Sequence, residues 1–294
     1  MADPRTRVDD FMRAPMAAAM FVLAGRQGFD ADRLAEPATV TALTTTAQHD
    51  LNPWYRDAAA ERTRALTLVR PLHDLVTKVV TDPRNAWWSA PLDRHTQLLL
   101  TGRDDRRRDD LRVPTGPNDG WETYAQRPAH AVITSTELPV ATGDPIRSGA
   151  HAELSHGVGD WDPVYPMRQE RLTVSPTARV YEVNSPEDWH HLVLRHTDTT
   201  TPTFSDENLR DTAGLEHGPA PTWSTAATEH DAVHLTFTGL LTTLYVPHTT
   251  ANVTTTLWSW SYESTLWLRQ AFDAATTLDD LLEPPGAHAD GPRL

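Results

Sequence analysis

The chain contains no cysteine among its 294 residues, and Lys78 is the only lysine among its 26 basic side chains. The absence of thiols excludes disulfides, cysteine-ligated zinc, iron–sulfur clusters and a cysteine nucleophile. The single lysine lies within a helical pattern, so we do not expect Schiff-base chemistry. The excess of arginine over lysine is typical of a GC-rich genome and suggests an actinobacterial source.

Long apolar runs are also missing, and the charge is strongly acidic. No stretch approaches the 18 apolar residues of a membrane span, and the apolar residues 14–25 follow two aspartates, unlike a signal peptide. The formal charge of −14 argues against a nucleic-acid partner, because such proteins cluster basic residues to neutralise phosphates. We therefore expect a cytoplasmic protein with neither a membrane nor a nucleic acid as partner.

Several enzyme signatures are absent from the sequence. It has no Gly-x-Ser-x-Gly nucleophile elbow, no Walker phosphate loop and no complete Gly-x-Gly-x-x-Gly fingerprint. It has no His-Glu-x-x-His zinc motif. Acyl transfer by an activated serine elbow, P-loop phosphoryl transfer and Rossmann-type redox chemistry are therefore not expected.

Hydrophobic periodicity predicts an α+β fold in which a helical N-terminal third is followed by a mostly antiparallel β core. We place the helical region at residues 1–93 and the α+β core at residues 94–294, which together could form one continuous domain. Helical patterns cover residues 5–27 and residues 57–80, and Pro71 should interrupt the second.

The remaining predicted elements lie in the core region. Ser185 is a good N-cap residue, Pro186 suits the first helical position, and together they predict a helix through His196. The predicted strands are Gln97–Thr101, Ala131–Thr136, Arg171–Val174, Arg179–Val183, Val233–Leu244 and Ser264–Leu268.

Histidine is the first place to look for chemistry, since the chain has 14 of them. His190, His191 and His196 crowd the predicted helix, but His191 and His196 are five residues apart and do not share a face as an i, i+4 pair would. We expect these side chains to lie on a solvated helix face. Elsewhere, His151 and His156 bracket Glu153 as a weak ligand set, so no metal is predicted.

Three segments of the core region carry the most suggestive residues. In the first, three hydroxyl residues, Thr134, Ser135 and Thr136, follow an apolar run. The second, residues 171–183, contains two strand patterns joined at a proline turn. In the third, residues 257–268, aromatic residues alternate along the chain and lead directly into Glu263. A carboxylate in aromatic surroundings is a common place for pKa tuning and for the stabilisation of cations.

In this order the three segments resemble the NAD-dependent ADP-ribosyltransferase fold of the Arg–Ser–Glu type. The resemblance implies that NAD is a substrate and that Glu263 and Ser135 are the catalytic residues.

The resemblance also assigns roles to the residues around that pair. It implies that Arg103, Thr134 and Thr136 bind the cofactor, with Arg94 as the other arginine considered. Trp260 and Tyr262 would face an acceptor, whether a small molecule or a protein. In this reaction nicotinamide leaves an oxocarbenium-like ribosyl cation, which transfers to the acceptor or to water.

Two alternatives from other classes remain open at this point. The first is a different small-molecule enzyme that uses histidine and carboxylate side chains as acid–base pairs, such as Glu153 with His156. It requires a histidine at the floor of the site. The second is a non-catalytic interaction protein whose 10 tryptophans form an exposed aromatic surface.

Overall fold

The computed structural model describes most of the N-terminal part of the chain and several segments of the rest. The described residues are 4–51, 58–95, 97–101, 140–141, 168–197, 219, 221–257, 260, 263–269 and 271–277.

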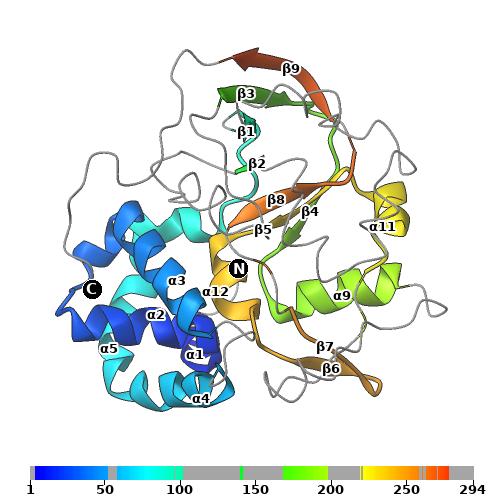
Figure 1. Cartoon of the computed structure of the whole chain (residues 1–294). Coiled ribbons are helices and arrows are strands. Elements are labelled where there is room, and N and C mark those ends of the chain that lie inside the picture. The colour runs from blue at the N-terminus through cyan, green and yellow to red at the C-terminus, as the bar shows by residue number, and fades with distance from the viewer. Residues whose placement is uncertain are drawn as a thin grey trace.

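Helices make up the described chain as far as residue 89, and they lie together beside the sheet (Figure 1). They are α1 (Pro4–Arg13), α2 (Pro15–Arg26), η1 (Arg33–Ala35), α3 (Pro37–Leu51), α4 (Ala58–Leu68), η2 (Arg70–Leu72), α5 (His73–Val80) and η3 (Pro83–Ser89). The periodicity over residues 5–27 predicted one helix, but the chain forms two. Ala14 is extended (φ −90°, ψ 123°) because a residue that precedes proline disfavours the helical conformation. The predicted interruption at Pro71 is confirmed, since Pro71 lies in η2 between α4 and α5.

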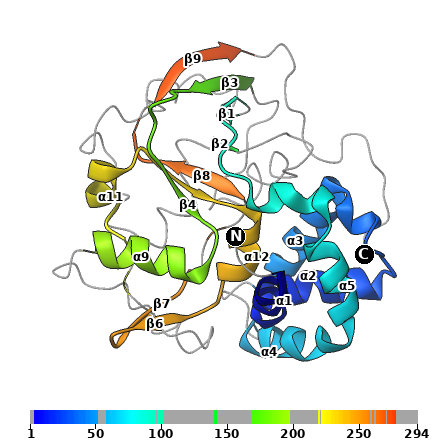
Figure 2. The ribbon, with the colours of Figure 1, turned by 180° about the vertical axis from the view of Figure 1, so that it is seen from behind.

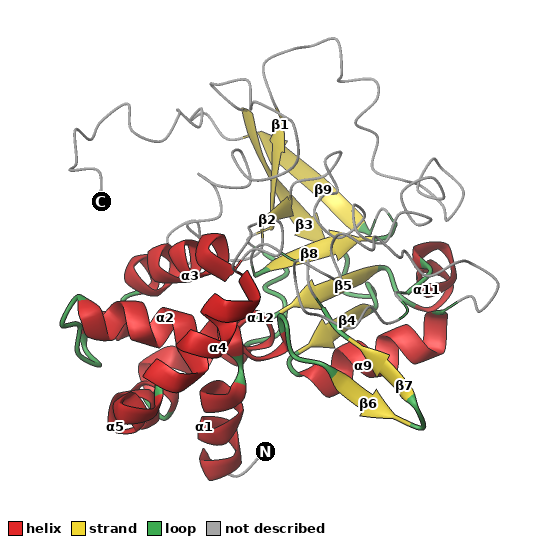
Figure 3. Ribbon diagram, turned by 60° about the horizontal axis from the view of Figure 1, so that its bottom comes forward, coloured by secondary structure: helices red, strands yellow, loops and turns green. Residues whose placement is uncertain are grey.

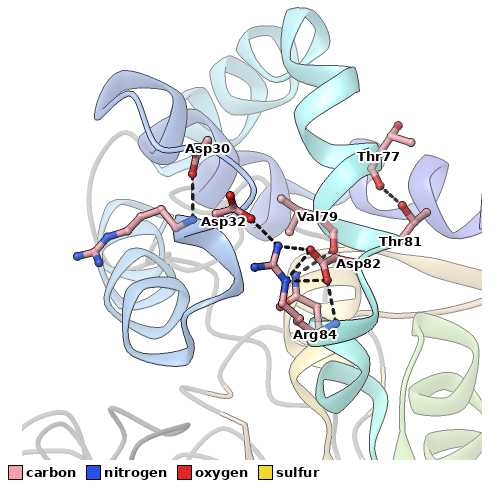
Figure 4. A network of polar contacts seen from close by, with 9 residues as sticks. Asp30, Asp32, Thr77, Val79, Thr81, Asp82 and Arg84 are labelled. Atoms are coloured by element: carbon pink, nitrogen blue, oxygen red, sulfur yellow. Dashed lines mark hydrogen bonds and ion pairs between the residues drawn. The ribbon is translucent and has the colours of Figure 1, made fainter.

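A network of polar contacts fixes η3 against the rest of the helical region (Figure 4). Asp82 caps η3 by accepting a hydrogen bond from the Arg84 backbone N–H at 2.8 Å. The Arg84 guanidinium in turn pairs with Asp82 and, at 2.7 Å, with Asp32 just before η1. The helix so anchored carries Trp88, whose ring lies 5.9 Å from Phe11. Helix η3 is thus held by ion pairs at its start and by the buried Trp88 near its end.

The described strands form one sheet of seven strands and a separate two-stranded ribbon. The sheet order is β4-β5-β8-β2-β1-β3-β9. The strands are β1 (Gln97–Thr101), β2 (Val140–Ala141), β3 (Arg168–Val174), β4 (Val180–Val183), β5 (Ala232–Leu235), β8 (Ser264–Trp267) and β9 (Phe272–Thr277), with β6 (His248–Thr250) and β7 (Val253–Thr255) in the ribbon. Neighbouring strands are antiparallel except for β4 and β5, which are parallel. The predicted mixture of helices with a mostly antiparallel sheet is therefore confirmed.

Helices α9 (Pro186–His196) and α11 (Trp223–Glu229) lie between β4 and β5 along the chain. The predicted cap of α9 is confirmed, because the Ser185 hydroxyl accepts a hydrogen bond from the Asp188 N–H. Seen from behind, α9 and α11 lie away from helices α1–α5, with α12 (Phe237–Thr243) between the two groups (Figure 2). Helix α12 contacts α2, η3 and α9, so it joins the helical region to the sheet.

The prediction of one strand over Val233–Leu244 was wrong in its second half. Strand β5 ends at Leu235, and α12 begins two residues later. Thr236 stops the strand, because its hydroxyl accepts the Gly239 N–H at 2.9 Å and caps the new helix. A Cβ atom on Gly239 would lie 2.1 Å from the Val183 carbonyl oxygen, so only glycine lets α12 pack so closely against the end of β4.

The buried apolar side chains form one cluster that runs from Val8 in α1 to Leu268 after β8. The rings of Trp88, Trp223, Trp260 and Trp267 are among its largest fully buried members. No helix within the described ranges is long and apolar enough to cross a bilayer.

Candidate active site

Three ionisable side chains meet where the parallel strands β4 and β5 end. Glu182 and His234 are each the last residue but one of their strands, and they are direct partners in the β4–β5 register. Strand β8 runs antiparallel to β5, so Glu263, just before its first residue, lies at the same edge. Figure 3 shows β4, β5 and β8 side by side. The carboxyl ends of parallel strands are where ligands bind in open α/β sheets.

Alternation along the strands decides which face of the sheet carries these groups. Tyr181 faces α9, because its hydroxyl donates to the Asp188 carbonyl at 2.8 Å. Glu182 therefore projects from the opposite face, and its strand partner His234 does the same. Thr265, the partner of His234 on β8, shares this face, and Glu263 precedes it by two residues.

Glu182 holds the imidazole of His234 from one side. Its Oε2 atom lies 2.5 Å from His234 Nδ1, while its Oε1 atom accepts the Leu92 N–H at 3.0 Å. Leu92 belongs to the segment between η3 and β1, so this hydrogen bond ties the carboxylate to that segment. A carboxylate with both oxygens engaged is well suited to orient a histidine ring and fix its proton on Nδ1.

Glu263 lies on the other side of the ring. Its Oε1 atom is 3.7 Å from His234 Nε2, an ion-pair distance too long for a hydrogen bond. The His234 side chain is only 1% exposed, whereas the Glu263 side chain is 12% exposed. Glu263 is therefore the member of this pair that a ligand can reach.

The charge of His234 follows from competing effects. Burial by itself lowers the pKa of the imidazole, but the hydrogen bond to Glu182 and the interaction with Glu263 outweigh it and raise the pKa to about 9. At neutral pH the cluster of Glu182, His234 and Glu263 thus contains two carboxylates around one imidazolium. We call this group the Glu–His–Glu cluster.

Sequence reasoning singled out Glu263 but missed its two partners. Glu182 and His234 lie inside the predicted strands Arg179–Val183 and Val233–Leu244. One sequence feature could have indicated them: each is an ionisable residue within a short apolar run, and an ionisable side chain that is buried there requires a partner. The pairing of β4 with β5 supplies that partner.

The structure does not describe the other predicted residues of the NAD site. Ser135, Thr134, Thr136, Arg103 and Tyr262 lie outside the described residues, and their roles remain predictions. The same holds for the alternative acid–base pair in the segment 151–156.

Trp260 and Arg94 are the remaining candidate residues that lie in the described part of the chain. Trp260 is 1% exposed, and its carbonyl accepts a hydrogen bond from Gln48 Nε2 at 3.0 Å. Its ring would have to become exposed to meet an acceptor. The Arg94 guanidinium donates to the carbonyl oxygens of Ser175 and Ala178, at 2.6 and 2.8 Å, and so supports the turn between β3 and β4.

The expectation that the histidines of α9 lie on a solvated face was wrong for two of the three. His190 and His196 are 0% and 1% exposed, and only His191 is exposed. The reason is that α9 is covered on several sides, by β4, α11 and the β6–β7 ribbon. His190 satisfies both ring nitrogens with the hydroxyl groups of Thr255 and Thr250.

Comparison of the chain with protein-family models, with curated proteins and with solved structures finds no match.

Proposed function

We propose that the protein is an enzyme whose Glu263 carboxylate stabilises positive charge on a reacting ribose, and that it cleaves the nicotinamide–ribose bond of NAD. The observation that supports this proposal is the Glu–His–Glu cluster itself. A predicted catalytic glutamate lies against a buried imidazolium, which a second carboxylate holds in place. Two carboxylates and one imidazolium carry a net charge of about −1 at neutral pH. An anionic cluster of this kind favours a substrate whose reacting centre becomes cationic.

The chemistry of NAD suits such a site because the leaving group needs no proton. The bond from the ribose anomeric carbon to the pyridinium nitrogen breaks, and its electron pair neutralises the ring, so nicotinamide departs uncharged. The positive charge remains on the ribosyl group as an oxocarbenium-like cation. Water or a nucleophile of the acceptor then bonds to the anomeric carbon and releases one proton. Glu263 would stabilise this cation as a fixed anion, while His234 and Glu182 keep its carboxylate in position.

A second candidate is acid–base catalysis on another small molecule, which the location of His234 favours. This candidate requires a histidine at the floor of the site, and His234 lies directly behind Glu263. With a pKa of about 9, His234 holds a proton at neutral pH, and a bound substrate that shortened the 3.7 Å gap between His234 Nε2 and Glu263 Oε1 would let this proton pass through Glu263 to a basic leaving group. This chemistry fits alcohol or amine leaving groups, whereas nicotinamide requires no such proton.

Nicotinamide release from NAD tests the first candidate. The purified full chain is incubated with millimolar NAD, and free nicotinamide is measured by chromatography. We expect turnover by the wild type and a loss of roughly 10²–10³ in kcat for Glu263→Gln, with little change in KM. Glu187→Gln is the matched control, since Glu187 is an exposed glutamate that also lies beside a histidine.

The proposal is wrong if the wild type releases no nicotinamide, or if Glu263→Gln retains wild-type turnover. The same variants are then tested on p-nitrophenyl esters, phosphates and glycosides. Hydrolysis of one of these that is lost in both Glu263→Gln and His234→Asn would establish the acid–base candidate in its place.

A further inference from the structure

A second group of potential ligands lies at the opposite end of β5. His196 at the end of α9, Glu229 at the end of α11 and His230 next to it each offer one ligand atom, and these atoms all lie within 4.8 Å of one another. His230 and His234 are four residues apart on nearly extended chain, about 13 Å at about 3.3 Å per residue. This group is therefore separate from the Glu–His–Glu cluster.

Each of the two imidazoles has a buried ring nitrogen that could bind a ligand. The Nε2 atoms of His196 and His230 are both buried, and neither has a hydrogen-bond partner within the described part of the chain. His196 is 1% exposed, so an unpaired ring nitrogen there carries the cost of a buried polar atom without a partner. The rings are nearly perpendicular, at 87°, with their centroids 5.5 Å apart. A ligand that accepts both lone pairs would remove that cost.

Glu229 completes the group from the solvent side. Its side chain is 40% exposed, and Arg195 Nε donates to Oε2 at 2.6 Å. That bond leaves Oε1 as the oxygen available to a ligand.

The local fold holds the three residues in place independently of any ion. The Thr222 N–H donates to the His196 carbonyl at 2.8 Å, which joins the end of α9 to the start of α11. The ring of Tyr181 lies against His230 at 5.1 Å. Asp231, the next residue, pairs with Arg179 at 3.2 Å. A site fixed in this way by its surroundings can bind a ligand with little reorganisation.

We propose that His196, Glu229 and His230 form a binding site for a late first-row divalent ion such as Zn²⁺. Two imidazole nitrogens and one carboxylate oxygen form the three-residue ligand set of open zinc sites, with a fourth position left for water. In a tetrahedral site with bonds of about 2.1 Å, the ligand atoms are about 3.4 Å apart, a separation that lies within the 4.8 Å limit of this group. The same nitrogen-rich set disfavours Mg²⁺ and Ca²⁺, which prefer oxygen ligands.

The sequence contains no local signal for this site, because its two histidines lie in different segments of the chain. His191 and His196 do not share a face, and the partner that His196 meets is His230, which follows another helix 34 residues further along the chain. The contact between α9 and α11 brings the two together.

Cobalt titration tests the site, because Co²⁺ takes zinc sites and its visible absorption reports the coordination geometry. The full chain is freed of metal with EDTA and titrated with Co²⁺ and then with Zn²⁺, and bound metal is counted by equilibrium dialysis. We expect about one ion per chain and a tetrahedral Co²⁺ spectrum that Zn²⁺ abolishes. His230→Gln and Glu229→Gln should each weaken binding by at least about tenfold. His191→Gln, which changes the exposed histidine of α9, should bind as the wild type does.

A wild type that binds no Co²⁺, or Co²⁺ binding that His230→Gln and Glu229→Gln leave unchanged, would overturn the proposal. His196→Asn is a third variant, but its burial threatens folding. Glu229 is partly exposed and its variant should fold, so the test does not depend on His196. Binding is measured without substrate, so this result is independent of the proposed NAD reaction.

Discussion

Replacement of Glu182 by glutamine gives the most direct test of the Glu–His–Glu cluster. The change retains the size of the side chain but removes the charge that holds the proton on His234. In the wild type His234 Nδ1 and the Leu92 N–H reach different oxygens of Glu182, and glutamine places an NH2 donor at one of these two positions, so one of the two hydrogen bonds is lost. We expect the pKa of His234 to fall by about 1–3 pKa units in Glu182→Gln.

The contribution of His234 to the free energy of unfolding follows from its pKa in the wild type. A rise of the His234 pKa from 6.5 in the unfolded chain to about 9 in the folded protein corresponds to about 3–4 kcal/mol, at about 1.4 kcal/mol per pKa unit. Because the folded-state pKa is the higher one, this contribution is fully present below pH 6.5 and is lost as the pH rises through about 9. Glu182→Gln should lose most of it, so its stability should depend less on pH in this range.

The assay combines urea unfolding at several pH values with an NMR titration of the histidine rings. The pH dependence of the wild type is compared with that of Glu182→Gln, so that the other titrating groups cancel. At pH 7 we expect Glu182→Gln to be about 2–3 kcal/mol less stable than the wild type, because a buried ion pair has lost one partner. Glu187→Gln, which removes an exposed carboxylate 3.9 Å from His191, should change stability by less than about 1 kcal/mol. A His234 resonance that titrates below pH 7 in the wild type would refute the reasoning.

Two further predictions concern helices α12 and α9, which lie next to the strands of the site. Gly239→Ala should destabilise the protein by about 1–3 kcal/mol in urea unfolding, because its Cβ would lie 2.1 Å from the rigid Val183 carbonyl oxygen. Gly25→Ala is the matched control: its Cβ would meet only the flexible end of Leu72 at 3.1 Å, so a cost as large as that of Gly239→Ala would contradict the steric argument. Ser185→Ala should cost about 1 kcal/mol in thermal unfolding through loss of the α9 cap, and an unchanged melting temperature would show that the cap contributes nothing.

The sequence predicted those features that local chemistry determines. Ser185 and Pro186 begin a helix because a side-chain cap and a fixed φ act within one turn. Pro71 interrupts a helix for an equally local reason. Local signals also explain the error over Val233–Leu244. Phe237, Leu240, Leu241 and Leu244 recur at helical spacing behind the Thr236 cap, but the threonines and valines around them favour a strand.

The candidate site was predictable only in part, because its three members come from segments that are far apart in the chain. Glu263 attracted attention through its aromatic neighbours, which are local. Its partner His234 depends on two facts that no local pattern contains, the parallel pairing of β4 with β5 and the register that sets Glu182 opposite His234. Parallel pairing requires a long crossover, here through α9 and α11, and its register is set by helix packing rather than by a turn.

The crossover through α9 and α11 leads into β5, and the two proposed sites lie at the two ends of this strand. One end of β5 carries His234 beside Glu182, and the other end follows His230 beside His196. Arg179 closes the amino end of this strand pair through Asp231, while the Thr236 hydroxyl closes the carboxyl end by donating to the Val183 carbonyl at 3.3 Å. Helix α9 packs against β4 and also contacts α11, so its position bears both on the β4–β5 pair and on the contact between His196 and His230. A substitution that moves α9 should change metal binding and the pKa of His234 together, whereas one confined to the Glu182 side chain should change only the second.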